Sequence, residues 1–383
     1  MKKIFLLLMA AVTIVACKND DTDFSSYTNG SSSSSSTDPI PEDAIKVISI
    51  TYNGGSVTVS GDDANYVTIN GADVTVTSEI DSLLLILSGT TTDGSLLVNR
   101  QKKFGIKLNG VSINNVDGPA INNQGSKYLY LEVAGGTTNT LTDGTTYTEQ
   151  VYDQKGAFFS EGEMYLYGTG TLNVTGNCRH AIACDDFIVI DDNVTLNVKS
   201  PSGSGIKVND GLWINNGTID INVTADAARG IRCDSIVVIN GGNTTIATSG
   251  DCVYDSSTMD YSSAACIKCD YPFTMTAGSL TMTSSGDGGK GINCTRDIIF
   301  RGGTLVAETI GDNINGKPKA IKSDTGIIVS GGSFRATVAK SWACDNGYED
   351  GSLSDDELAK KRITVEGSPT TKNITKESVE IIF

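Results

Sequence analysis

Residues 230–242 read GIRCDSIVVINGG, a run of β-branched side chains that ends in a glycine pair. The same frame recurs along the chain. The related segments are HAIACDDFIVIDDNVTLNV from His180, GIKVNDGLWINNGTIDINV from Gly205, GIRCDSIVVINGGNTTIAT from Gly230, CIKCDYPFTMTAGSLTMT from Cys266, GINCTRDIIFRGGTLVAET from Gly291, AIKSDTGIIVSGGSFRATV from Ala320 and, more loosely, GAFFSEGEMYLYGTGTLNV from Gly156. Short strands joined by Gly, Asn and Asp turns at a near-constant period predict a solenoid.

The repeat length indicates which solenoid this is. The small residues that open successive repeats are 25, 24, 25, 36, 25 and 29 positions apart, and the two long intervals contain insertions at 254–264 and 313–319. Because no helical pattern lies within a repeat, we expect an all-β, single-stranded parallel β-helix with coils of about 25 residues rather than a leucine-rich horseshoe. Strand-like runs at 67–78, 83–89 and 104–113 predict earlier coils. The acidic stretch at 352–361 predicts a helix, and RITVEG and SVEIIF predict strands that cap the end.

The net charge limits the kinds of partner that the protein can bind, and the N-terminal segment indicates its compartment. The net charge of −16 argues against nucleic acid, because a duplex binder needs a basic surface. MKKIFLLLMAAVTIVAC has a basic start and an apolar stretch too short to span a bilayer, and it ends like a bacterial lipobox. We therefore expect a lipoprotein signal peptide at 1–16, lipidation of Cys17, and a Ser-rich linker at 17–45 before a domain at 46–383. The alternative is a plain signal peptide with an incidental Cys17.

The sequence KNDDTD (18–23), directly after this cysteine, resembles the acidic export signal of Bacteroidetes surface lipoproteins. The resemblance implies a lipid-anchored protein of the outer membrane displayed on the cell surface, and we expect it to be a monomer.

Alternation along the strands predicts two inward columns. The first contains Ile182, Ile206, Ile231, Ile267, Ile292 and Ile321, and the second contains Cys184, Val208, Cys233, Cys269, Cys294 and Ser323. Cys233 thus takes a slot that Val208 fills one coil earlier, so we interpret it as a small buried side chain. A disulfide or a tetrahedral zinc site is disfavoured, because in-register stacking spaces the thiols along a line.

The residues between and after these columns point outward. The first outward column is Ala183, Lys207, Arg232, Lys268, Asn293 and Lys322, and the second is Asp185, Asn209, Asp234, Asp270, Thr295 and Asp324. We call the two columns together the outer strip. Another acidic set, Asp226, Asp251, Asp287 and Asp312, precedes the strands. Two interpretations compete: a solvated face whose charges screen one another, and a polysaccharide groove.

The N-terminal half resembles a known family. IKLNGVSINNVDGPAI (106–121), GGTTNTLTDGTTY (135–147) and GTGTLNVTGN (168–177) are similar to secreted bacterial carbohydrate-binding-domain proteins. This resemblance implies a right-handed parallel β-helix related in fold to pectate lyases. It also implies binding of plant-type polysaccharide, such as cellulose or polygalacturonate, and bound calcium.

The expected function is therefore non-catalytic polysaccharide binding. We expect the glycan to contact Lys207, Arg232, Lys268, Lys322, Asn209 and the outward Trp213. We expect Ca²⁺ to be bound by Asp226, Asp251, Asp287, Asp185, Asp234 and Asp270, because Ca²⁺ takes six to eight oxygen ligands. One alternative is a pectate-lyase-like enzyme with Lys207, Lys268 or Lys290 as base, and the other is an adhesin or structural surface protein. The single histidine, His180, is interpreted as a turn residue rather than a base.

Overall fold

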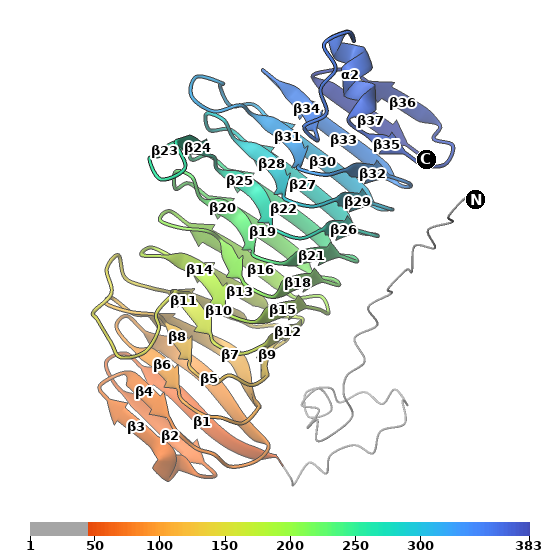
Figure 1. Ribbon diagram of the computed structural model, residues 1–383. Coiled ribbons are helices and arrows are strands. Elements are labelled where there is room, and N and C mark those ends of the chain that lie inside the picture. Colours follow the sequence, from red (N-terminus) through yellow and green to blue (C-terminus); the bar gives the residue numbers. More distant parts are fainter. Residues whose placement is uncertain (1–44) are drawn as a thin grey trace, which may run out of the picture. The chain divides into compact units, whose positions relative to one another are not determined.

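The structure is a computed structural model that describes residues 45–383. The predicted signal peptide, Cys17 and the linker up to residue 44 lie outside the described residues. Residues 46–383 form one unit, a parallel β-solenoid of about eleven turns (Figure 1). The predicted fold class is confirmed.

A typical coil has three strands, one on each face, and every strand pairs in parallel with its counterpart in the next coil. The first face is a separate sheet, here called sheet 1. Its twelve strands are β3 (Val67–Asn70), β4 (Asp73–Val76), β6 (Ser95–Val98), β8 (Ile121–Asn123), β11 (Gly156–Ser160), β14 (His180–Cys184), β17 (Ile206–Val208), β20 (Arg229–Cys233), β25 (Ala265–Cys269), β28 (Lys290–Cys294), β31 (Lys319–Ser323) and β34 (Trp342–Asp345).

The other two faces belong to one larger sheet, because the long strand β7 (Phe104–Asn114) contributes to both. The second face carries β9 (Leu129–Val133), β12 (Met164–Gly168), β15 (Phe187–Ile190), β18 (Gly211–Ile214), β21 (Ile236–Ile239), β26 (Phe273–Met275), β29 (Ile298–Phe300), β32 (Ile327–Val329) and β35 (Thr364–Val365). The third carries β10 (Thr138–Thr142), β13 (Thr171–Thr175), β16 (Thr195–Ser200), β19 (Thr218–Val223), β22 (Asn243–Thr248), β27 (Ser279–Ser284), β30 (Thr304–Thr309) and β33 (Ser333–Val338).

Both ends of the stack are closed by antiparallel strands (Figure 1). At the start, β1 (Lys46–Asn53) pairs with β2 (Val57–Gly61) and, in parallel, with β5 (Leu83–Thr91). At the other end, β37 (Ser378–Ile382) pairs with β33 and with β36 (Thr371–Ile374). The predicted helix is α2 (Asp355–Lys361), which begins at a capping box made by Ser354 and Glu357. Antiparallel capping hides the edges that an open solenoid would present for aggregation.

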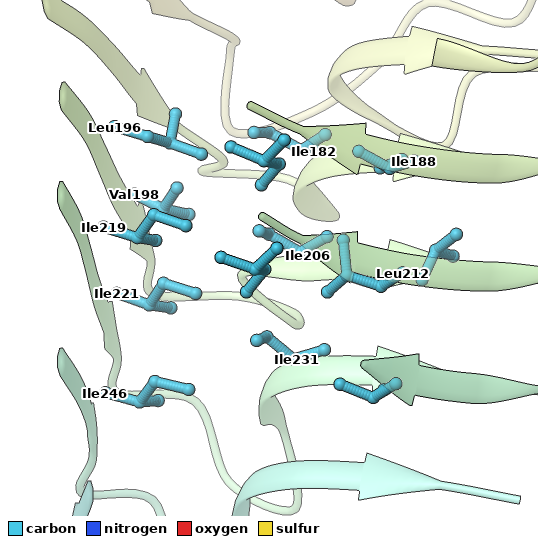
Figure 2. Packing of buried hydrophobic residues seen from close by; sticks show 14 of the residues in the cluster. Ile182, Ile188, Leu196, Val198, Ile206, Leu212, Ile219, Ile221, Ile231 and Ile246 are labelled. Atoms are coloured by element: carbon cyan, nitrogen blue, oxygen red, sulfur yellow. The ribbon is translucent and has the colours of Figure 1, made fainter. Parts of the chain in front are cut away.

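The core lies inside the coils, as the alternation predicted. Ile182, Ile206 and Ile231 point toward the strands of the other two faces (Figure 2). Ile231 and Cys233 are 0% and 1% exposed, and Cys233 is in register with Val208. Complete burial of an isoleucine side chain stabilises the fold by roughly 1.5–3 kcal/mol, so each column contributes in every coil. The first position of this repeat, Gly230, requires a glycine, because a Cβ there would lie 2.3 Å from Ile246 Cγ2.

The thiols of the second inward column also cap turns. Cys233 Sγ donates to the carbonyl of Ile236 at 3.2 Å, and Cys184 Sγ donates to that of Phe187 at 3.6 Å. Burial raises the pKa of Cys233 to about 12, so it is neither a nucleophile nor a ready metal ligand at neutral pH. The eight cysteines of the described part are all free. Cys344, which was not assigned to either inward column from the sequence, is in register with Ile321 and extends the first inward column.

Candidate functional site

The outer strip forms on the outward side of sheet 1. Lys207 pairs in register with Arg232, and Arg232 pairs with Lys268. The column continues through Asn293 to Lys322, and Ala183 precedes it one coil earlier. The predicted register of this column is therefore confirmed over six coils.

The cations of the outer strip are ion-paired within the strip. Lys207 Nζ lies 2.6 Å from Asp234 Oδ2, and Arg232 Nε lies 3.3 Å from Asp234 Oδ1. The same pairing joins Lys268 to Asp270 at 2.7 Å and Lys322 to Asp324 at 2.6 Å. Asn209 Oδ1 accepts a further hydrogen bond from Lys207 Nζ at 2.7 Å. Partial burial opposes ionisation of Asp234, yet Lys207 and Arg232 hold the pKa of its carboxyl below its usual range. The strip is thus polar but largely self-neutralised.

The acidic set in the turns has a structural role. Asp226 Oδ1 accepts the backbone N–H of Asp251 at 2.8 Å, and Asp251 Oδ1 accepts that of Asp287 at 2.7 Å. Asp287 in turn accepts the backbone N–H groups of Ile314 and Asn315 at 2.8 and 2.9 Å. Each of these three carboxylates therefore caps a turn of the next coil, which satisfies a backbone donor that the solenoid turn leaves unpaired, whereas Asp312 is ion-paired with Lys340.

Carboxylates do converge elsewhere. In residues 45–383, one group of potential metal ligands meets within 4.8 Å, and it consists of Asp153, Glu161 and Asp185. Of the six predicted calcium ligands, the group includes Asp185 alone. Lys155 Nζ lies 2.9 Å from Asp153 Oδ2 and contacts Asp185, so an ammonium already offsets part of the negative charge of the group. Burial is the main cause that raises the pKa of Glu161, with Asp185 adding to it.

Trp213 lies on β18 of the second face, away from the outer strip. Its ring contacts Phe187 edge-on, with centroids 5.6 Å apart, and Phe187 contacts Tyr128 in the same way at 5.7 Å. The indole also lies over Gly211, where a Cβ would come within 2.6 Å of the ring. Trp213 is partly buried, as part of an aromatic surface that continues to Tyr130 and the neighbouring strand.

A large hollow adjoins the C-terminal half of the outer strip. We call it the basic pocket; its volume is about 950 Å³, and nine of its lining residues are Lys or Arg against four Asp or Glu. Lys268, Asn293 and Lys322 of the strip line it, together with the insertion at 260–263 and the C-terminal cap. A chain of net charge −16 thus concentrates positive charge in one concave place. A concave surface lined by charges of one sign produces a strong local potential, which attracts anionic ligands in this case.

A further column of sheet 1, outside the predicted outer strip, supplies this pocket. Arg229, Ala265, Lys290, Lys319 and Trp342 are in register along five consecutive strands. The signal was present in the sequence, since a basic residue stands directly before the small residue that opens five of the seven repeats: Lys155, His180, Arg229, Lys290 and Lys319.

His180 is not placed as a base. Its Nδ1 accepts the backbone N–H of Ser204 at 3.0 Å, and the residue is the first of strand β14 rather than the predicted turn residue. Burial, with the nearby charge of Lys207 and Arg232, lowers its pKa to about 4. The imidazole is therefore neutral at physiological pH.

Fold and surface define the class of protein: a parallel β-solenoid with a polar outer strip that leads into a cationic hollow. The sequence profile described as "Carbohydrate-binding domain-containing protein" matches residues 70–254 and 223–313. The chain belongs to this family.

One curated protein and one solved structure are also similar to this chain. A carbohydrate-binding domain-containing protein of Acetivibrio thermocellus is 31% identical over 115 residues, which are 28% of this chain and 40% of that protein. The chain therefore spans less than half the length of this relative. The structure of the polysaccharide lyase-like protein from C. thermocellum, a gadolinium derivative, superposes with a TM-score of 0.54 at 24% identity, over 66% of this chain and 96% of that one. The likeness supports the fold alone. Among residues 45–383, no helix combines the length and the apolar character of a membrane span.

Proposed function

We propose that this solenoid binds polysaccharide without cleaving it, along the outer strip and into the basic pocket. The observation that supports this most strongly is the continuity of the two features, because Lys268, Asn293 and Lys322 belong to both. Successive coils are about 4.8 Å apart, so the strip offers polar groups at a spacing close to that of a sugar ring. Plant-type glycans such as polygalacturonate and cellulose are the proposed ligands.

Because the cations of the outer strip already have Asp partners, a glycan carboxylate must replace an Asp carboxylate in order to bind there. A glycan carboxylate that contacts Lys207 or Lys268 replaces a partner that the protein already supplies, so each contact adds little net affinity. Affinity then comes from many weak contacts along a preformed surface, which suits a long polymer better than a short one. Trp213 and Phe187 offer a separate contact surface for neutral glycan on the second face.

For calcium assistance, we propose Asp153, Glu161 and Asp185 as the binding group, because they are the carboxylates that meet. A calcium ion there would replace Lys155 as the counter-charge of these three side chains. Asp226, Asp251 and Asp287 are poorer candidates, since their oxygens accept backbone hydrogen bonds.

We also propose that the protein is a monomeric lipoprotein of the outer membrane, displayed on the cell surface through a lipidated Cys17. Cys17→Ala should move the protein from the membrane fraction to the soluble fraction. Protease treatment of intact cells then reports which side of the membrane the solenoid occupies.

The binding proposal is tested by retention on insoluble polygalacturonate and cellulose, with and without a chelator. Changing Lys207, Arg232 and Lys268 together to Ala should weaken retention on polygalacturonate more than on cellulose. The matched control changes Lys127, Lys199 and Arg301, three exposed cations that lie outside the strip, and should leave retention intact. Equal losses from both triple variants would contradict the strip. Release of an ultraviolet-absorbing unsaturated uronate would contradict the non-catalytic part and favour a lyase.

A further inference from the structure

In the described part of the chain, two partly buried cations of the basic pocket lack the carboxylate partner that their neighbours have, and so does the exposed Lys317. Within residues 45–383, neither Arg229 nor Lys290 has a carboxylate oxygen within 4.0 Å among the ion pairs. Lys319, the next member of their column, lies 2.7 Å from Asp345. The strip cations Lys268 and Lys322 have Asp270 and Asp324. Arg229 and Lys290 thus differ from Lys319, Lys268 and Lys322, each of which is paired with a neighbouring aspartate.

The insertion of the long repeat interval holds both side chains. Arg229 Nη2 donates to Ser262 Oγ at 2.9 Å, and Lys290 Nζ contacts Oγ of the adjacent Ser263. Ala265, which is completely buried, separates the two cations in the register of sheet 1, and both cations line the basic pocket. Hairpin β23 (Val253–Asp255) and β24 (Asp260–Ser262) therefore brings two hydroxyls to two cations that come from alternate coils.

Burial without a counter-charge is costly for both groups. Burial, followed by the positive charge of Lys322, lowers the pKa of Lys290 to about 8, and burial also lowers the pKa of Arg229. The Nε atom of Arg229 is buried and has no hydrogen-bond partner. Buried cations in proteins are ordinarily paired, so this pair of side chains fits a group that brings negative charge from outside.

We propose that Arg229 and Lys290, positioned by Ser262 and Ser263, bind an oxyanion group of an acidic saccharide in the basic pocket. The guanidinium offers a planar pair of donors and the ammonium offers a point charge. The serine hydroxyls have remaining hydrogen-bonding capacity. This donor set suits a carboxylate or a sulfate ester, the two oxyanions that acidic glycans carry. The oxyanion site stands on the geometry of the pocket, whereas its assignment to a saccharide rests on the proposed function.

The site also gives the long repeat interval a role. The hairpin of the insertion, β23 and β24, adds no strand to the stacked sheets, since it pairs only with itself in the described structure. Two serines of the insertion accept hydrogen bonds from Arg229 and Lys290, which also donate to the carbonyls of Ala227 and Gly288. The outer strip would then bind the body of the polymer with low selectivity, and the basic pocket would select for its charge.

The test is isothermal titration calorimetry of the full chain at constant ionic strength. The probes are trigalacturonate, a sulfated disaccharide, neutral cellotriose and inorganic sulfate. Arg229→Gln and Lys290→Gln should each bind the preferred acidic probe about tenfold to a hundredfold more weakly than the unmodified protein. Lys199→Gln, the same change at an exposed site outside the pocket, should bind as the unmodified protein does. Lys290→Arg keeps the charge and should retain binding, which separates loss of the site from loss of the fold.

The outcomes distinguish this site from the proposed function. Preference for one acidic saccharide identifies its carrier group as carboxylate or sulfate. Equal binding of cellotriose and trigalacturonate, unaffected by both Gln variants, would overturn the oxyanion site and leave polysaccharide binding in place. Binding of inorganic sulfate alone would overturn the saccharide assignment together with the proposed function. Unchanged acidic-probe affinity in folded Arg229→Gln and Lys290→Gln proteins would overturn the proposal.

Discussion

Replacing Lys290 with methionine should make the protein more stable at neutral pH while it removes a ligand-binding charge. Methionine matches the lysine side chain up to Cε, lacks the terminal ammonium and suits the largely buried position. The pKa of Lys290 is lowered from 10.5 to about 8, and a shift of that size corresponds to about 3 kcal/mol of unfavourable burial of the ammonium. Loss of the hydrogen bonds to Ser263 and Gly288 offsets about 1–2 kcal/mol of this gain. The net gain at pH 7 should be about 1–2 kcal/mol.

The pH dependence of the stability difference between the two proteins is a stronger test of the buried ammonium. Between pH 8 and pH 10.5 the folded state has released the proton of Lys290 and the unfolded state still holds it, so the stability of the unmodified protein rises with pH. The advantage of Lys290→Met should therefore vanish and then reverse over this interval. Urea unfolding of both proteins from pH 7 to pH 10.5 measures the difference. A variant that is destabilised by the same amount at every pH would refute the reasoning, because it would show that no buried ammonium is relieved.

Three further predictions follow from the coils. Cys233→Val should change the free energy of unfolding by less than about 1.5 kcal/mol and leave glycan retention intact, because the thiol only fills a slot and donates one weak bond; a large loss of retention would reverse that assignment. Asp251→Asn should be nearly silent in urea unfolding and in calcium titration, since the amide oxygen still accepts the N–H of Asp287, whereas Asp251→Ala should cost about 1–3 kcal/mol; a calcium response lost in Asp251→Asn alone would speak for a metal ligand. Stability should fall as the pH decreases from 6.5 to 4, because the unfolded state protonates His180 before the folded state does, and His180→Asn should flatten this slope; an unchanged slope would count against the buried, neutral imidazole.

The inward columns were predictable because they depend on short-range patterns. Alternation within five residues places Ile231 and Cys233 on one side, and the repeat length alone brings them beside Ile206 and Val208. The outer strip follows from the same two facts. Even the pairing of Lys268 with Asp270 is local, since the two side chains lie two positions apart on one strand.

The remaining features depend on how neighbouring coils and loops meet. Asp251 looked like a metal ligand, but its partner is a backbone N–H 36 residues further along the chain, which no local pattern reveals. Trp213 was correctly placed outward, but the sequence did not say that β18 lies on another face than the strip. The convergence of Arg229 and Lys290 on Ser262 and Ser263 required the fold of an insertion, where the repeat gives no register.

The most direct measurement is a crystal structure of the protein with a bound acidic oligosaccharide. The account predicts glycan density along Lys268 and Lys322 of the outer strip, with one oxyanion group between Arg229 and Lys290 in the basic pocket. Density confined to the aromatic surface around Trp213, or anywhere else with Arg229 and Lys290 untouched, would contradict it.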